Sequence, residues 1–133
     1  MLGEQIGEGK GKRTGRRVLE VEPQFLVEVS FEDASTLLGV SGMNIGTYAS
    51  SNRPDGTLSG QGQGVFATVD GEIVTWKGIG AGKLSGNGAV SYRGCLTYST
   101  TSTKLARLNS IAGVFEFEVD PAGNTTTKVW AWS

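Results

Sequence analysis

Histidine is absent from this sequence of 133 residues, and cysteine occurs once, at Cys95. An intrachain disulfide is therefore impossible, and no Ser–His–Asp or Cys–His catalytic site can be built from this chain. Since the commonest metal ligand is missing, a zinc site would need four ligands from one cysteine and carboxylates. We predict no metal site, and no phosphate-binding or dinucleotide-binding motif indicates a cofactor.

Long apolar runs and an excess of one charge are also missing. No apolar stretch approaches the roughly 18 residues that a membrane-spanning helix needs, and residues 1–6 lack the basic and apolar segments of a signal peptide. The formal net charge of −1 provides no general field that would attract nucleic acid or anionic membranes. We therefore expect one soluble, cytoplasmic domain over residues 1–133, without nucleic-acid or membrane partners.

Helical periodicity is scarce, and its best candidate, residues 31–38, is short and ends at Gly39. Alternation of apolar and polar residues is common instead, which is typical of half-buried strands. Phe25, Val27, Val29 and Phe31 share one face of such a stretch, and Glu28, Ser30 and Glu32 share the other. Later in the chain, Phe115, Phe117 and Val119 alternate with Glu116 and Glu118 in the same way.

The pattern predicts about eight strands joined by tight turns. They cover residues 3–18, 25–32, 45–51, 57–69, 72–84, 89–101, 111–119 and 125–132. Arg53-Pro54-Asp55-Gly56 and Asp70-Gly71 are strong turn signals between such runs. Because a long meander with free edges would aggregate, we predict an all-β fold whose strands form a closed antiparallel barrel.

Glycine is the outlier of the composition, with 21 residues where average usage would give about 7%. Three expected strands carry glycine at every second position. These trios are Gly7, Gly9, Gly11; Gly60, Gly62, Gly64; and Gly78, Gly80, Gly82. The large apolar residues Leu58, Phe66 and Trp76 share their faces, so we expect the glycines to point inward. There they either let the sheet coil tightly or leave room for a ligand.

The last third of the chain has a recognisable pattern. A strand of tyrosine and small residues, 85–98, is followed by Leu105-Ala106-Arg107-Leu108 and by Gly113-Val114-Phe115. This arrangement resembles the allene oxide cyclase barrel superfamily, a group of calycin-like barrels that includes dirigent proteins and small bacterial barrels. The resemblance implies a substrate held in an apolar lumen and a homo-oligomer, either a dimer or a trimer.

Five aromatic residues on the expected inner face are candidate ligand-binding residues: Tyr48, Phe66, Trp76, Tyr92 and Tyr98. Phenol hydroxyls among apolar rings would orient a small ligand. The alternative interpretation is that these side chains simply fill the barrel.

The resemblance also implies a glutamate deep in the barrel, for which Glu8 is the nearest candidate. By alternation, however, Glu8 lies between inward glycines and should point outward with Lys10 and Lys12. The basic run of residues 10–17 is expected to be a solvated strand face. The pattern leaves open whether Trp130 and Trp132 face the core or a subunit interface.

Three functions are compatible with these patterns. The first is a barrel that binds a small apolar or amphipathic ligand in its lumen. The second is a cofactor-free cyclase or isomerase acting on a lipid-like substrate. The third is a packed, purely structural barrel that acts through its oligomer surfaces. A lumen filled solid by side chains would exclude the first two.

Overall fold

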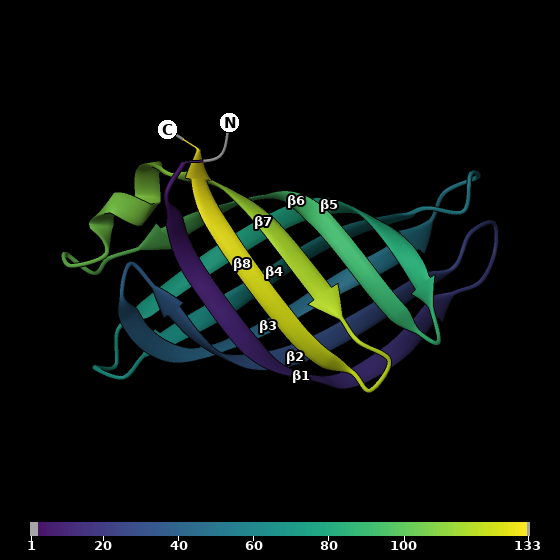
Figure 1. Ribbon diagram of the computed structural model, residues 1–133, viewed down its shortest axis with the longest axis horizontal. Helices are drawn as coiled ribbons and strands as arrows, with labels where there is room; N and C mark the ends of the chain where they lie inside the picture. The colour runs from purple at the N-terminus through teal and green to yellow at the C-terminus, as the bar shows by residue number, and fades with distance from the viewer. Residues whose placement is uncertain (1–2, 133) are drawn as a thin grey trace.

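The computed structural model describes residues 3–132, which form one closed barrel of antiparallel strands (Figure 1). The strands are β1 (Gln5–Glu20), β2 (Leu26–Leu37), β3 (Val40–Asn52), β4 (Leu58–Thr68), β5 (Ile73–Gly86), β6 (Ala89–Thr100), β7 (Ala112–Val119) and β8 (Asn124–Trp132). A short 3₁₀ helix, η1 (Ala106–Ser110), lies between β6 and β7. Each strand pairs with the next, and β8 pairs with β1, so the predicted closed meander is confirmed.

The stretch with weak helical character, residues 31–38, is the second half of β2. Alternation continues through it, because Phe31, Asp33 and Leu37 are buried whereas Glu32 and Ala34 are exposed. The structure therefore agrees with the all-β prediction in this stretch as well. The strand places a buried carboxyl, Asp33, at a position where an apolar residue would be expected.

The glycines of the inner face lie beneath aromatic rings. A Cβ atom on Gly60 would come 2.9 Å from the ring of Tyr92, and one on Gly82 would come 2.6 Å from the same ring. A Cβ on Gly64 would overlap the indole of Trp76. The missing side chains thus let large rings lie flat against a tightly coiled wall.

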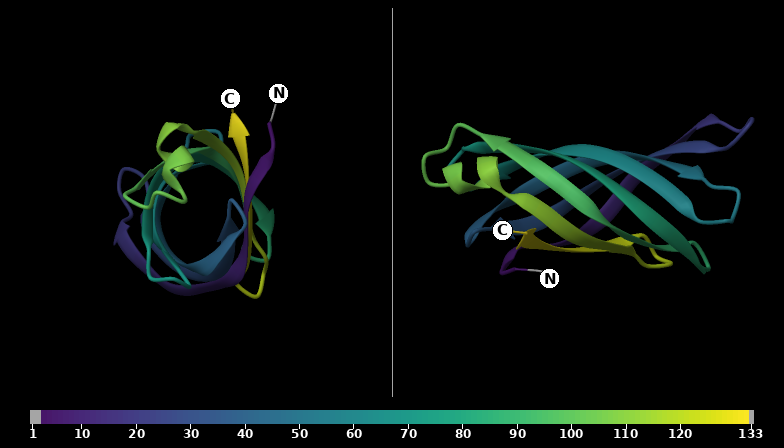
Figure 2. Two further views of the ribbon diagram at one scale, coloured as in Figure 1. Left: turned by 90° about the vertical axis from the view of Figure 1, so that its left-hand side faces the viewer. Right: turned by 90° about the horizontal axis from the view of Figure 1, so that it is seen from above.

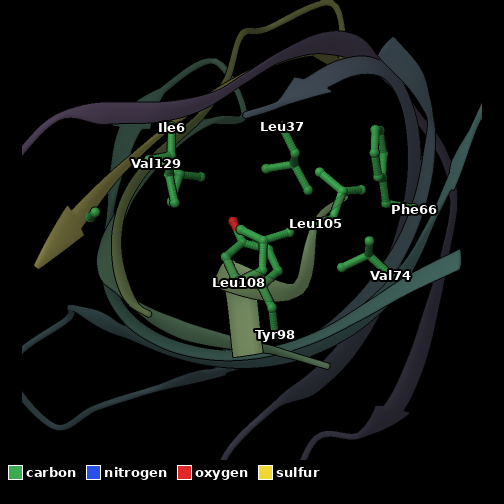
Figure 3. Packing of buried hydrophobic residues seen from close by; sticks show 9 residues of the cluster. Ile6, Leu37, Phe66, Val74, Tyr98, Leu105, Leu108 and Val129 are labelled. Atoms are coloured by element: carbon green, nitrogen blue, oxygen red, sulfur yellow. The ribbon is translucent and has the colours of Figure 1, made fainter. Parts of the chain in front are cut away.

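At one end of the barrel, η1 and the segment before it lie over part of the rim (Figure 2). Leu105 and Leu108 are fully buried and point into a ring of side chains from the strands, including Phe66, Tyr98 and Val129 (Figure 3). Asn109 anchors this segment, since its Oδ1 accepts a hydrogen bond from the backbone of β6 at 2.8 Å and its Nδ2 donates one back at 3.0 Å. Side chains of this segment therefore fill the lumen at this end, which we call the closed end.

The outward face of β8 carries both tryptophans. Val129 and Ala131 are buried inside the barrel, whereas Trp132 is exposed and Trp130 is half-buried. The two tryptophans therefore belong to the outer surface and not to the lumen. Among residues 3–132, no helix has the length and hydropathy needed to cross a membrane.

Candidate functional site

The lumen contains a cavity of about 100 Å³ between the closed end and the middle of the barrel. All five aromatic residues that the sequence singled out line it: Tyr48, Phe66, Trp76, Tyr92 and Tyr98. The remaining walls are formed by apolar residues such as Leu37, Leu96 and Phe115, and by glycines of β1, β4 and β5. The interior is thus hollow at the place where these side chains converge.

Asp33 carries the one carboxyl group in the buried core of the described residues, and it is 2% exposed. It lines the cavity from β2, directly opposite Gly11 of β1. A Cβ atom on Gly11 would lie 2.5 Å from the Cβ of Asp33, and one on Gly9 would lie 3.1 Å from its carboxyl carbon. The glycines of β1 therefore leave the space that the Asp33 side chain occupies.

Neighbouring polar groups hold the carboxyl of Asp33 in place. The hydroxyl of Ser35 donates a short hydrogen bond to Asp33 Oδ1. Burial raises the pKa of Asp33 above its usual value, and hydrogen bonds from Ser35 and Asn44 oppose that rise. None of the ion pairs within residues 3–132 involves Asp33. This carboxyl therefore takes up a proton more readily than a solvated aspartate does.

Two threonine hydroxyls extend this polar region on the other side of β1. The register places Thr125 and Thr127 of β8 opposite Gly11 and Gly9, respectively. Both hydroxyl oxygens are buried, and neither has a hydrogen-bond partner within the described part of the chain. Buried polar groups are rarely left unpaired. Thr127 lines the cavity, so its hydroxyl can accept a partner from a molecule bound there. We call Asp33, Ser35, Asn44, Thr125 and Thr127 the polar wall.

Aromatic residues of β2, β3, β6 and β7 form an aromatic wall beside the polar wall, since Phe31 precedes Asp33 on the same face of β2 and Phe117 pairs with Thr127. The rings of Phe31 and Phe117 are 4.9 Å apart, and the edge of Tyr48 meets the ring of Tyr92 at 5.6 Å between centroids. The hydroxyl of Tyr92 shares a 2.5 Å hydrogen bond with Ser50. Burial raises the pKa of Tyr92 and of Tyr98, so both phenols stay neutral. A molecule that contacts both walls would meet apolar rings and hydrogen-bonding groups.

Glu8 borders the cavity through its position between Gly7 and Gly9, but its side chain is exposed. Gln5 Nε2 donates a 3.2 Å hydrogen bond to it there. The carboxyl inside the lumen belongs to Asp33 instead, and sequence reasoning missed it. The alternation of the sequence did indicate an inward Asp33, because this residue follows Phe25, Val27, Val29 and Phe31 on the same strand face.

The described residues that line the lumen include few metal-ligating side chains. Within residues 3–132, no group of three histidine, cysteine, aspartate or glutamate side chains is arranged to hold one. Cys95 is exposed on the outside of β6, away from the polar wall. The polar groups that line the lumen include the carboxyl of Asp33, the amide of Asn44 and hydroxyls such as those of Ser35 and Thr127.

No family model matches this chain, and no curated protein is similar to it in sequence. Solved structures share its fold. A protein described as having unknown function from Clostridium acetobutylicum is 17% identical with a TM-score of 0.80, covering 100% of both chains. A conserved protein of unknown function from Rhodopseudomonas palustris is 14% identical with a TM-score of 0.80, covering 98% of this chain and 97% of that one.

A third similar structure is described as an enzyme from Penicillium herquei. It is 14% identical with a TM-score of 0.68, and the match covers 96% of this chain and 92% of that one. At this level of identity the three comparisons establish a shared eight-stranded barrel architecture over almost the whole chain. They carry no information about ligands or activity.

Proposed function

We propose that this protein binds a small, mostly apolar molecule in its lumen and orients it through one polar group. The observation that carries the proposal is the cavity of about 100 Å³ lined by the aromatic wall and by residues of the polar wall. An apolar cavity of about 150 Å³ can admit benzene, so the inner cavity suits a compact group of a few heavy atoms. Asp33 and the unpartnered hydroxyl of Thr127, which both line the cavity, would bind that group's polar atom.

A binding experiment with a narrowed cavity tests this proposal. Leu96 lines the cavity from β6, and its neighbour Thr97 is exposed on the outer face. We expect Leu96→Phe to abolish the thermal stabilisation by small aromatic and alicyclic ketones and alcohols. Thr97→Phe adds the same ring outside the barrel and should respond like the wild type. If no compound stabilises the wild type, or if Leu96→Phe binds as well, lumen binding is rejected.

A second candidate function is a cofactor-free isomerase or cyclase, and the position of Asp33 favours it. A buried carboxyl with a raised pKa suits proton transfer to and from a ligand held beside it. This candidate would agree with the resemblance of Leu105–Glu118 to the allene oxide cyclase superfamily. If the wild type turns over no ligand while Asp33→Asn still binds it, the protein is a binder and not an enzyme.

We also propose that the barrel forms a homo-oligomer in the cytoplasm. Met43, Ile45, Val65 and Ile73 are exposed on the outer face of β3, β4 and β5, and the register places Ile45 opposite Val65. We call these four residues the outer patch. Contiguous exposed apolar surface is typical of an interface. The exposed thiol of Cys95 supports a reducing compartment.

A further inference from the structure

A β-bulge in β1 puts two arginines on the inward-facing side of this strand, Arg13 half-buried and Arg16 exposed to solvent. Arg13 is opposite Phe31 of β2, but the next paired residue of β1 is Gly15, opposite Ser30. Thr14 is therefore an extra residue, and the inward face changes from odd to even positions along β1. Arg16 consequently lies opposite Val29, a buried residue of the inner face. Strict alternation would have put Arg13 and Arg16 on opposite faces.

These arginines border a second space at the end of the barrel opposite η1. This space, which we call the mouth, has a volume of about 200 Å³. Its apolar walls come from six strands and include Phe25, Val27, Leu58, Leu84, Val90 and Val119. The four turns of this end surround it, and the β1–β2 hairpin extends beyond the other turns (Figures 1 and 2).

The mouth and the inner cavity are adjacent, because Tyr48 and Tyr92 line both of them. Tyr92 is fixed by its hydrogen bond to Ser50. The ring of Tyr48 packs against Tyr92 and Phe117, both at 5.6 Å between centroids. The inner cavity alone is smaller than the roughly 300–1,000 Å³ of common ligand pockets. A ligand of ordinary size would therefore occupy both spaces.

The positive charge at the mouth has no acidic partner among residues 3–132. Three other arginines, Arg17, Arg93 and Arg107, are each paired with a glutamate. The ion pairs of the described residues include neither Arg13 nor Arg16. Arg13 lies against the β7–β8 turn, where a Cβ on Gly123 would be 3.3 Å from its guanidinium.

Two acidic residues of the nearby turns, Asp120 and Asp55, are already engaged. Asp120 accepts hydrogen bonds from the backbone of Ala122 and Asn124, both at 2.9 Å. Asp55 accepts bonds from the backbone and hydroxyl of Thr57. These carboxylates stabilise their own turns and form no ion pair with the mouth arginines.

Arg13, Arg16 and Tyr48 line the mouth together. Burial raises the pKa of Tyr48 and Tyr92 adds to the rise, whereas the charges of Arg13 and Arg16 lower it. Two cationic groups and a phenol hydroxyl therefore face the same apolar space. Guanidinium groups bind carboxylates and phosphates through paired hydrogen bonds, and apolar walls strengthen such contacts.

We propose that the mouth binds an oxyanion, a carboxylate or a phosphate, on the ligand whose apolar part fills the lumen. Arg13 and Arg16 bind its oxygens, and the apolar part passes Tyr48 and Tyr92 toward Asp33. This inference rests on the proposed lumen binding and adds the ligand's charge and orientation. In this arrangement the mouth would hold the charged end of an amphipathic anion, and the inner cavity beside the polar wall would hold its opposite end.

Isothermal titration with three matched probes tests the inference: 4-phenylbutanoate, 4-phenylbutyl phosphate and the neutral 4-phenyl-1-butanol. We expect the wild type to bind at least one anion about tenfold more tightly than the alcohol, the effect of one charged hydrogen bond. The double variant Arg13→Gln, Arg16→Gln should lose that preference while its affinity for the alcohol stays unchanged. Arg17→Gln, which removes an outward arginine, is the matched control and should keep it.

The outcomes separate this inference from the proposed function. Equal affinity of the wild type for the alcohol and both anions overturns the inference and leaves lumen binding intact. A preference for anions that survives the double substitution also overturns it. If none of the probes binds, including the alcohol, lumen binding itself fails. Whichever anion binds more tightly identifies the head group.

Discussion

Trp76 Nε1 on β5 donates a 2.8 Å hydrogen bond to Oδ1 of Asn44 on β3. The two strands lie on either side of β4, so this bond spans three strands of the barrel. This bond orients the Asn44 amide so that its NH₂ group is free to donate to Asp33. An aromatic residue of the lumen therefore positions a residue of the polar wall. Asp33 lies at the end of this chain of contacts, with Ser35 on its other side.

Asp33→Asn should change how stability depends on pH. Because the pKa of Asp33 is raised in the folded state, the folded protein binds that proton more tightly than the unfolded chain. The wild type therefore loses stability as pH rises from the ordinary value of 3.8 through the folded pKa. The variant lacks this loss, so its stability relative to the wild type should increase across that window. Urea denaturation from pH 3 to 8 measures the difference.

Asp55→Asn provides a control of opposite sign. Hydrogen bonds from Thr57 lower the pKa of Asp55, so its contribution is present above the ordinary carboxyl pKa and disappears as pH falls through the folded value. The variant should therefore lose stability relative to the wild type near neutral pH but not in acid. Parallel pH profiles for the two variants would contradict the raised pKa of Asp33.

Gly11→Ala should destabilise the barrel by about 1–3 kcal/mol, the usual effect of forcing an atom into a packed interior. The new Cβ would overlap the carbonyl oxygen of Glu32 and lie 2.5 Å from the Cβ of Asp33. Gly15→Ala is the matched control on the same strand, because its Cβ would meet no atom within 4 Å. Chemical denaturation should show a change within about 0.5 kcal/mol for Gly15→Ala. Equal effects of the two substitutions would refute the close approach of β1 and Asp33.

Leu108→Ala should cost about 2–5 kcal/mol of unfolding free energy, because it removes a fully buried side chain from the closed end. Val69→Ala, at a position 76% exposed in the β4–β5 turn, should have little effect. Thermal and urea unfolding of both variants provide the measurement. A mild effect of Leu108→Ala would mean that η1 does not fill the lumen at the closed end.

Ile45→Lys should dissociate the proposed oligomer by placing a charge in the centre of the outer patch. Lys128→Glu alters an exposed residue of β8, which does not neighbour β3, β4 or β5, and is the control. Light scattering after size-exclusion chromatography measures the mass of each protein. A monomeric wild type, or an oligomer that survives Ile45→Lys, would reject the outer patch as the interface.

Much of the fold was predictable from local patterns. Alternation identified all eight strands, since each inward residue is followed by one that faces solvent. The Asp70-Gly71 pair marked its turn because glycine there adopts a φ of +84°. The same patterns located the five aromatic residues of the lumen.

What the sequence alone determined is the alternating pattern, the turns and the absence of histidine, and these together specify an all-β barrel without His-based chemistry. The tertiary structure decided which polar groups enter the lumen. Asp33 is buried because Gly9 and Gly11 of the neighbouring strand leave space for it. Arg13 and Arg16 share the inner face because one extra residue in β1 shifts the register against β2. Both effects depend on pairing between strands, which no single segment of the sequence encodes.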